Sequence, residues 1–395
     1  MATVAITASA ANKQDMIARA EALVPLVAAR AAETDANRAV PDDLIAAMID
    51  AELFATIAPR DYGGIELGLD TFSEIVRRIS AASPSTGWVA AFLMGAAWRM
   101  LTFPREGQEE IYGGRNYVLG AGAAQPITGV ERVEGGYRLT GRTAWNSGAS
   151  HAEWFTINGL LIEEERPPEL LIFAVPRREV SVIDNWHIMG MQGTASCDIA
   201  VDGVFVPQRR SAPFMPALAG QSAGHALHAN PMYHIPFLPF AMNEVLPVIV
   251  GTHRGAADAL FSRIKGRMGT ISGAKSAEKV PAQVRLARSL AQAQAAELLL
   301  EALVARNMAA LPEAGAPVNR SEMKLHAALL TQMCLDSVND MARGVGGDSF
   351  RDDALFQRYF RDLNVVARHA FLDLETAGES YAKLLLGLPI SDPLI

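Results

Sequence analysis

The chain has 395 residues, of which 50% are hydrophobic and 20% are charged, and its formal net charge is −8. Such an apolar chain can bury enough surface to offset its conformational entropy, which excludes a disordered protein, and its acidic balance argues against a nucleic-acid-binding protein. Its two cysteines, Cys197 and Cys334, are too few for a disulfide framework or a cysteine-only zinc site.

No segment is typical of a membrane or secreted protein. No stretch approaches the roughly 18 unbroken apolar residues of a membrane span. The N-terminal sequence MATVAITASAANKQD lacks a basic region followed by a long apolar core, so it does not resemble a secretory signal. We therefore expect a globular, cytoplasmic protein without a membrane or nucleic-acid partner.

Residues 1–116 have the pattern of a helical domain. Residues 13–38 are rich in alanine, and their apolar side chains recur with a period near 3.6. Pro41 and the acids after it are typical of a helix start. Helix is expected again from Asp70, and Pro84 begins an apolar helix with two tryptophans.

The middle of the chain, residues 117–212, has the pattern of a β domain. Short β-like runs alternate with Gly, Asn and Pro, and Gly135-Gly136 predicts a hairpin turn. These runs favour a barrel or a sandwich.

Residues 213–395 are expected to form a loop followed by a four-helix bundle. The expected helices are Asn243 to Gly269, Val280 to Ala310, Asn319 to Arg343 and Asp352 to Leu386. The predicted fold class is therefore α+β, with helices, then β structure, then the bundle.

Common catalytic motifs are missing, but several short sequence strings occur in an order that is informative when they are taken together. They are Pro59-Arg-Asp-Tyr-Gly-Gly64, Gly141 to Gly148, Gly190 to Ser196, Gly344 to Phe350, and Arg361-Asp362. Together with the helix–β–helix texture, these strings resemble the acyl-CoA dehydrogenase superfamily over nearly the whole chain.

This resemblance implies a flavin between the β domain and the bundle. It places Ser147 near flavin N5 or O4, with Trp88, Asn146, Gly148 and Arg368 also against the cofactor and backbone N–H groups of the 145–148 turn on its pyrimidine edge. It also implies that Gly346 and Gly347 allow close approach and that Arg263, or Arg267, binds the phosphate. Read without the resemblance, Ser147 is a turn residue and the arginines lie on a solvated helix face.

The C-terminal region departs from the dehydrogenase pattern. The glutamate that acts as base in those enzymes would fall at about Ala370, and its neighbour here is His369. Arg361-Asp362 followed by His369 resembles the two-component flavin monooxygenases that hydroxylate 4-hydroxyphenylacetate and steroid phenols. Ser85-Thr-Gly-Trp88 resembles their Ser-x-Gly-Trp turn.

The monooxygenase resemblance implies a function and a set of partners. A separate reductase would supply reduced FMN or FAD, by contact or by diffusion, and dioxygen would add at flavin C4a to give a hydroperoxide. Ser147 would steady that adduct, and His369 would be the base for a phenolic or fused-ring aromatic substrate. The family also implies a homotetramer, and the apolar helix around Leu290 to Leu303 fits subunit contacts.

The loop from Ser222 to Pro239 is expected to cover the substrate. Its candidate contact residues are His225, His228, Tyr233 and His234. The spacing of His225 and His228 is a weak metal-ligand signal that a polar loop explains better, so no metal is expected.

Three alternatives remain open. The first is an acyl-CoA dehydrogenase or other flavin oxidase, for which Glu244 and Glu379 are poor candidate bases. The second is a monooxygenase of the same fold that oxidises nitrogen or sulfur. The third is a helical scaffold without flavin, which the retained Trp88, Ser147 and His369 argue against.

Overall fold

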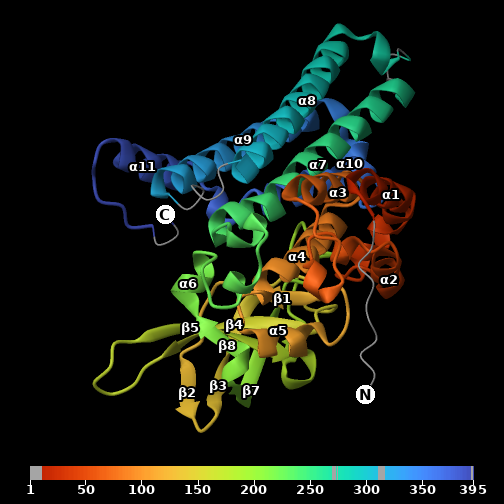
Figure 1. Ribbon diagram of the computed structural model, residues 1–395. Helices are drawn as coiled ribbons and strands as arrows, with labels where there is room; N and C mark the ends of the chain where they lie inside the picture. The colour runs from red at the N-terminus through yellow and green to blue at the C-terminus, as the bar shows by residue number, and fades with distance from the viewer. Residues whose placement is uncertain (1–10, 269–272, 274, 310–315, 393–394) are drawn as a thin grey trace.

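The computed structural model describes residues 11–268, 273, 275–309, 316–392 and 395. Helices from both ends of the chain pack together in the upper part of Figure 1, and strands from the middle of the chain lie below them. The predicted α+β class, with helices before and after a β region, is confirmed. The first ten residues and the expected helix ends at Gly269 and Ala310 lie outside the described residues.

The N-terminal helices begin where capping chemistry favours a start. They are α1 (Lys13–Ala36), α2 (Asp42–Asp50), α3 (Leu69–Ala82), α4 (Pro84–Met100) and α5 (Arg105–Tyr112). In a capping box before α1, Asn12 Oδ1 accepts the Asp15 N–H at 3.1 Å, and Asp15 Oδ2 accepts the Asn12 N–H at 3.0 Å. Ser83 caps α4, which begins at Pro84 as predicted and is almost wholly buried.

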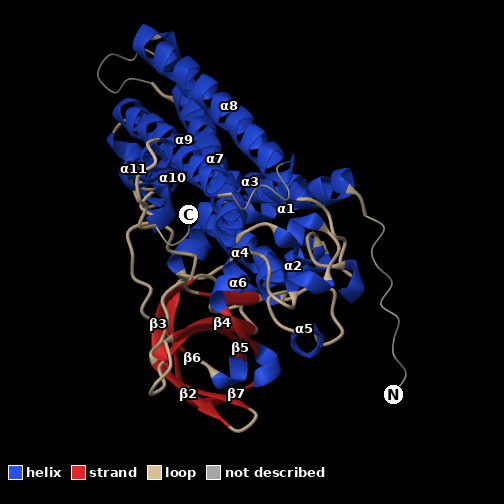
Figure 2. Cartoon of the chain, turned by 60° about the vertical axis from the view of Figure 1, so that its left-hand side comes forward, coloured by secondary structure: helices blue, strands red, loops and turns tan. Residues whose placement is uncertain are grey.

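The strands form two four-stranded sheets. They are β1 (Gly120–Gly122), β2 (Gly129–Val133), β3 (Gly136–Asn146), β4 (Trp154–Leu161), β5 (Glu169–Pro176), β6 (Ser181–Ile183), β7 (Cys197–Pro207) and β8 (Ser211–Pro213). The strand orders are β1-β4-β5-β8 and β2-β3-β7-β6, and the strands are red in Figure 2. Leu139 and Phe155, from different sheets, share one buried core. The β2–β3 hairpin turns at Gly135, whose φ of 78° suits glycine.

Most of the C-terminal part is long helix. The helices after the sheets are α6 (Phe214–Leu218), α7 (Phe237–Gly266), α8 (Val280–Ala309), α9 (Pro317–Val345), α10 (Leu355–Val366) and α11 (Leu374–Leu385). The expected start of α7 at Asn243 is wrong by six residues, because Pro239 lies in its first turn, where no helical N–H bond is needed. Within the described ranges, none of the helices has the length and apolar character needed to span a bilayer.

The final helix predicted from Asp352 to Leu386 is wrong as one element, because it divides into α10 and α11. Asp373 Oδ1 accepts the Thr376 N–H at 2.7 Å and so caps the start of α11. The Asp-x-x-Thr spacing was a signal for this second start. The break leaves residues 367–373 outside both helices, and His369 lies within it.

A buried charge cluster joins α1, α10 and the loop before β7. Arg358 Nε and Arg361 Nη2, both on α10, donate to Asp35 Oδ2 of α1 at 3.1 and 3.2 Å. Asp362, also on α10, accepts the Met191 N–H at 2.6 Å. Since Met191 lies in the loop before β7, this cluster fixes that loop against the helices.

Two glycines of the same loop allow its close packing. A Cβ on Gly190 would lie 2.4 Å from the Arg361 carbonyl oxygen, and a Cβ on Gly193 would lie 2.2 Å from Thr34 Cγ2. The Gly193 N–H also donates to Ser85 Oγ at 3.2 Å. The glycines of this string are therefore required by contact with the backbone of α10 and with side chains of α1 and α4.

We predict that Asp362 makes folding stability fall as pH rises. Burial, together with the charge of Asp35, raises the pKa of Asp362 to about 7. Between about pH 4 and pH 7 the folded chain therefore holds a proton that the unfolded chain releases, which lowers the free energy of unfolding as pH increases. Asp362→Asn keeps an oxygen for Met191 but cannot ionise, so relative to wild type it should gain up to ~1.4 kcal/mol per pH unit in this range.

Urea unfolding at several pH values measures this difference. Asp353→Asn, at an exposed carboxylate before α10, is the control and should follow the wild-type pH profile. Parallel profiles for Asp362→Asn and wild type would contradict the prediction.

Candidate functional site

A cavity of about 770 Å³ lies where the helical and β parts meet. Its walls come from α4, α7, the first sheet, the loop before β7 and the break between α10 and α11. The Trp and Phe side chains among its lining are Trp88, Phe92, Trp98, Trp145, Trp186, Phe214, Phe237 and Phe371. A mostly apolar cavity of this size with few polar groups is typical of a small-molecule or cofactor site.

Four of the predicted site residues line this cavity: Trp88, Ser147, Arg368 and His369. They come from α4, from the turn after β3, and from the break after α10. The Trp88 indole N–H donates to Ser147 Oγ at 2.9 Å, and the Trp88 and His369 ring centroids are 5.8 Å apart. Ser147 and His369 therefore both lie beside Trp88.

A chain of hydroxyl groups continues from Ser147 into the loop before β7. Ser147 Oγ and Ser196 Oγ are 2.9 Å apart, and Ser196 Oγ and Thr194 Oγ1 are 2.8 Å apart. Thr194 Oγ1 donates to the Met191 carbonyl oxygen at 3.0 Å, which uses its only proton. Ser196 must then donate to Thr194, and Ser147 must donate to Ser196.

The resulting order of protons has a consequence for Ser147. Its hydroxyl accepts one hydrogen bond from Trp88 and gives its proton to Ser196, so one lone pair remains. In this arrangement Ser147 offers an acceptor, and it can donate to a ligand only if the chain of hydroxyls reverses.

Asn146 and Gly148, which flank Ser147, do not line the cavity, whereas Trp145 of the same turn does. Asn146 is fully buried, and its Nδ2 donates to the Thr143 carbonyl at 3.1 Å while its Oδ1 has no partner in the described residues. Gly148 has a φ of 73°, and its N–H donates to the Thr194 carbonyl at 2.8 Å. The backbone N–H groups of Ser147 and Gly148 are thus bonded within the protein, which corrects the expectation that they are free for a flavin edge.

His369 combines a structural contact with a place on the cavity wall. Its Nδ1 accepts the Phe371 N–H at 3.4 Å, and the two rings are 4.9 Å apart in an edge-on arrangement. Burial lowers the pKa of His369 to about 4, so the ring is neutral near pH 7. With Nδ1 accepting, the proton of the neutral ring is assigned to Nε2.

The predicted phosphate site lies outside the cavity lining of this chain. Arg263 Nε donates to the Val345 carbonyl at 3.3 Å, and its Nη2 pairs with Asp348. Arg267 Nη1 donates to the same carbonyl at 2.9 Å. A Cβ on Gly346, whose φ is 83°, would lie 2.4 Å from Arg267 Nη1, whereas Gly347 has open space around it. These groups order the turn after α9.

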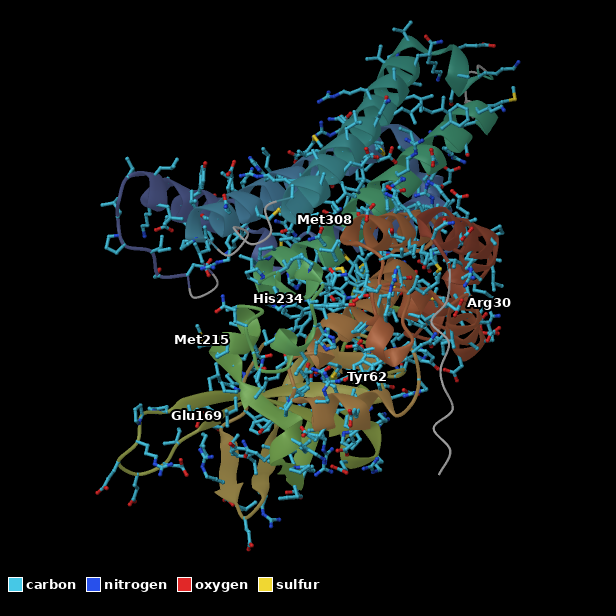
Figure 3. All side chains as sticks on the ribbon, viewed as in Figure 1. Arg30, Tyr62, Glu169, Met215, His234 and Met308 are labelled. Carbon is cyan, nitrogen blue, oxygen red and sulfur yellow. The ribbon has the colours of Figure 1, made fainter. Side chains whose placement is uncertain are left out.

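The four loop residues expected to contact substrate do not line the cavity either. Their polar atoms instead bond within the protein: His225 Nδ1 to Ser222 Oγ at 2.9 Å, His228 Nε2 to Gln108 Oε1 at 2.8 Å, Tyr233 Oη to the Ile57 carbonyl at 3.0 Å, and His234 Nε2 to the His228 carbonyl at 2.8 Å. His234 lies at the level where the helical and β parts meet (Figure 3). The structure therefore places this group in the packing of the loop, which corrects the substrate assignment.

Sequence reasoning missed other polar groups at the cavity. Thr194 and Ser196 lie in the Gly190 to Ser196 string, which contributed to the family resemblance but did not indicate a hydroxyl chain. Glu244, which the sequence offered only as a poor candidate base, also lines the cavity and forms an ion pair with Arg99 across α4 and α7. A charged residue inside each of two apolar helices was the available signal. In the described residues, no group of three His, Cys, Asp or Glu side chains could hold a metal ion.

Comparison with known proteins agrees with this architecture. The family described as "Acyl-CoA dehydrogenase, N-terminal domain" matches residues 14–114, and "Acyl-CoA dehydrogenase, C-terminal domain" matches residues 245–374. A pigment production hydroxylase of Rhodococcus sp. (strain ATCC 21145) is 53% identical over 97% of this chain and 99% of its own length.

Two further relatives point to the same branch. The oxygenase subunit HsaA of a flavin-dependent monooxygenase from Rhodococcus jostii (strain RHA1) is 30% identical over 95% of this chain and 100% of its own length. The crystal structure of the HsaA monooxygenase from M. tuberculosis matches with a TM-score of 0.89 and 27% identity, over 98% of this chain and 100% of that one. The chain belongs to the acyl-CoA dehydrogenase superfamily, in its branch of flavin-dependent monooxygenase oxygenase components, and is an oxidoreductase.

The residues at the cavity fit a flavin ring. Its aromatic walls suit a planar tricyclic ring, and Ser147 offers a hydrogen-bond acceptor beside them. Arg368 adds a positive charge at the wall. Trp88, Ser147 and Arg368 would therefore hold the cofactor within this chain.

We predict that the Ser147–Ser196 bond contributes measurably to stability. Ser147→Ala and Ser196→Ala should each lower the free energy of unfolding by ~1–3 kcal/mol, because each leaves a buried hydroxyl without its partner. The double variant should cost less than the sum, with a coupling of about 0.5–3 kcal/mol. Urea unfolding measures this free energy for the two single variants and the double variant. The control combines Ser147→Ala with the distant Ser349→Ala, for which the two losses in free energy should add. Additive costs for Ser147 and Ser196 would refute the bond.

Proposed function

We propose that this chain is the oxygenase component of a two-component monooxygenase that hydroxylates an aromatic substrate with a phenolic or fused ring. Bound reduced FMN or FAD would supply the electrons and activate dioxygen. The observation that carries the proposal is the apolar, aromatic-walled cavity in which Ser147 and His369 each lie next to Trp88. Walls of this kind exclude water from a reaction that water would divert.

The residues beside Trp88 have distinct tasks in this proposal. Ser147 uses its remaining lone pair to accept a hydrogen bond from the cofactor, and Ser196 and Thr194 hold its hydroxyl in that orientation. His369, neutral with its proton on Nε2, hydrogen-bonds the substrate oxygen at the reacting end. It becomes a proton acceptor through Nε2 only if the long 3.4 Å bond to the Phe371 N–H is given up.

We predict that His369 is needed for hydroxylation and not for flavin binding. His369→Ala and His369→Asn should both lower product formation by ~10²-fold or more, because the hydrogen bond at the reacting oxygen is lost. The Asn side chain can still accept a hydrogen bond from the Phe371 N–H, so the free energy of unfolding of His369→Asn should stay near that of wild type. His369→Ala should lose ~1 kcal/mol of that free energy. Product yield, anaerobic binding of reduced FMN and urea unfolding separate these effects.

The pH profile gives an independent check on this role. Because its pKa is about 4, His369 should contribute no inflection to the hydroxylation rate between about pH 6 and pH 9. Unchanged product formation in either variant would remove His369 from the mechanism.

The test of the whole proposal uses the intact chain with a generic flavin reductase, NADH, FMN or FAD, and a panel of phenols and fused-ring aromatics. Oxygen incorporated into an aromatic product supports it. The competing dehydrogenase has one favouring observation, namely that Glu244 lines the cavity, although Arg99 already pairs with it. Anaerobic bleaching of oxidised flavin by an acyl-CoA, without any hydroxylated product, would favour that alternative and defeat the proposal.

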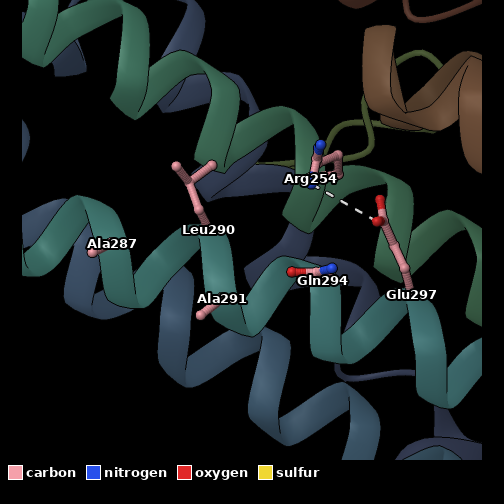
Figure 4. A pocket seen from close by; sticks show the side chains of 6 residues that line it. All are labelled: Arg254, Ala287, Leu290, Ala291, Gln294 and Glu297. Carbon is pink, nitrogen blue, oxygen red and sulfur yellow. Dashed lines mark ion pairs between the residues drawn. The ribbon is translucent and has the colours of Figure 1, made fainter.

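The partners in this proposal are a separate flavin reductase and further copies of the chain. One relative of this chain is the oxygenase subunit of a flavin-dependent monooxygenase, which supports a separate reductase as a partner. That reductase delivers flavin by contact or by diffusion. An apolar stripe on α8 supports a homotetramer, because Val284 and Leu298 are 61% and 59% exposed and lie with Ala291 at intervals of seven residues. Figure 4 shows a groove beside this stripe, where Arg254 Nη1 of α7 lies 3.8 Å from Glu297 Oε2.

We predict that Leu298→Glu disrupts the assembly. A charge in the α8 stripe would have to be buried without a partner, so the tetramer should dissociate to smaller species. Sedimentation velocity measures the change. Phe205→Glu, at an exposed phenylalanine on β7 far from α8 in Figure 1, is the control and should leave the mass unaltered. An unaltered mass for Leu298→Glu would show that α8 is not the interface.

A further inference from the structure

The cavity contains an ion pair, between Arg99 and Glu244, that has no role in the proposed reaction. Arg99 Nη1 of α4 donates to Glu244 Oε1 of α7, and Arg99 Nη2 donates to the Phe92 carbonyl oxygen. The Glu244 side chain is 1% exposed and that of Arg99 is 11% exposed. Both residues line the cavity.

The helix opposite Glu244 is shaped to admit its carboxylate. A Cβ on Gly95 of α4 would lie 1.8 Å from Glu244 Oε1, so a larger residue there would displace the carboxylate from its place beside Arg99. Burying an ion pair costs desolvation energy that an apolar pair of similar size would not incur. The fold therefore keeps two charges in an apolar wall where packing alone does not require them.

The pair lies along the wall beyond the Ser147 end of the cavity. The Trp88 ring, bonded to Ser147, has its centroid 4.6 Å from that of Phe92. The Arg99 guanidinium carbon is in turn 5.7 Å from the Phe92 centroid. Two aromatic side chains of α4 thus separate Ser147 from the charged pair along the cavity wall.

The pair has hydrogen-bonding capacity left over. No described residue bonds Glu244 Oε2, and a guanidinium has five N–H donors, of which two are used here. A carboxylate acceptor and a guanidinium donor lie together, and their charges cancel. A hydroxyl group matches this arrangement, because it can donate and accept at once and carries no charge.

We propose that the Arg99–Glu244 pair binds a neutral hydroxyl group at the end of the aromatic substrate away from the reacting carbon. Glu244 Oε2 accepts the hydroxyl proton in a hydrogen bond, and Arg99 donates to the hydroxyl oxygen. This inference rests on the proposed function and narrows its substrate to an aromatic ring with a second, uncharged hydroxyl. A carboxylate at that position is rejected, because it would lie against the Glu244 carboxylate.

Burial supports a discriminating role for the pair. Desolvation raises the pKa of Glu244, and Arg99 opposes that rise. A substrate that offers no hydrogen bond would displace water from these charges without replacing it. Such a substrate should therefore bind more weakly than its hydroxylated counterpart.

The test compares three probes of the same ring size: 2,6-naphthalenediol, 2-naphthol and 6-hydroxy-2-naphthoate. Each is titrated anaerobically into the intact protein with saturating reduced FMN, and affinity is measured by calorimetry. The diol should bind about ten- to a hundredfold more tightly than 2-naphthol, and the carboxylate should bind most weakly. Equal affinity for the diol and 2-naphthol, or preference for the carboxylate, would overturn the proposal.

Glu244→Gln makes the assignment specific to this pair. The variant leaves Arg99 with an uncompensated charge, so the advantage of the diol over 2-naphthol should fall and the affinity for 6-hydroxy-2-naphthoate should rise. An unchanged order of affinities in this variant would overturn the proposal. If the variant does not fold, the wild-type series decides alone.

A matched control separates this role from general stability. Asp392→Asn breaks the equally buried pair with Lys324, and neither residue lines the cavity. It should lower stability and keep the wild-type order of affinities. Loss of that order in the control would make the effect non-specific and count against the pair. Measuring reduced-FMN binding and hydroxylated product alongside distinguishes failure of this inference from failure of the proposed function.

Discussion

The site depends on the buried polar cluster that ties α10 to the rest of the chain. Asp35 of α1 meets Arg358 and Arg361, and Asp362 holds the Met191 backbone. Together with the bond from the Gly193 N–H to Ser85 Oγ, these bonds fix the loop before β7 against the helices, and that loop supplies part of the hydroxyl chain behind Ser147. One cluster thus positions groups from three distant parts of the sequence.

The cavity shows how a nearly apolar wall accommodates a few polar groups. Each is made tolerable by a specific partner: the hydroxyl chain ends on a backbone carbonyl, His369 stays neutral, and Arg99 neutralises Glu244. The partner also decides what capacity remains for a ligand. Ser147 can still accept a hydrogen bond from a ligand, His369 can still donate one, and the ion pair can do both. These different capacities favour one orientation of a ligand in the cavity.

Local sequence signals predicted the elements well where they act within a few residues. Pro84 marked the start of α4, Gly135-Gly136 marked a hairpin, and the strings around Trp88, Ser147 and His369 led to residues that line one cavity. The substrate assignment of the loop residues from His225 to His234 was wrong. A sequence shows that a side chain is polar, but it does not show whether that side chain faces a ligand or bonds within its own loop. The break between α10 and α11 was missed because residues 367–373 contain neither proline nor glycine, and only the cap at Asp373 marks the second start.

The sequence by itself determined the order of helices, sheets and helices, the branch of the superfamily it resembles and the chemistry available at Ser147 and His369. Composition, periodicity and short motifs carry this information, since they reflect interactions between near neighbours. Only the tertiary structure decided that Ser147 is left with an acceptor, that His369 is neutral, and that Arg99 and Glu244, which are 145 positions apart in the sequence, meet in the cavity wall. The physical reason is that hydrogen-bond direction, desolvation and ion pairing depend on which distant groups are brought within a few ångströms of one another.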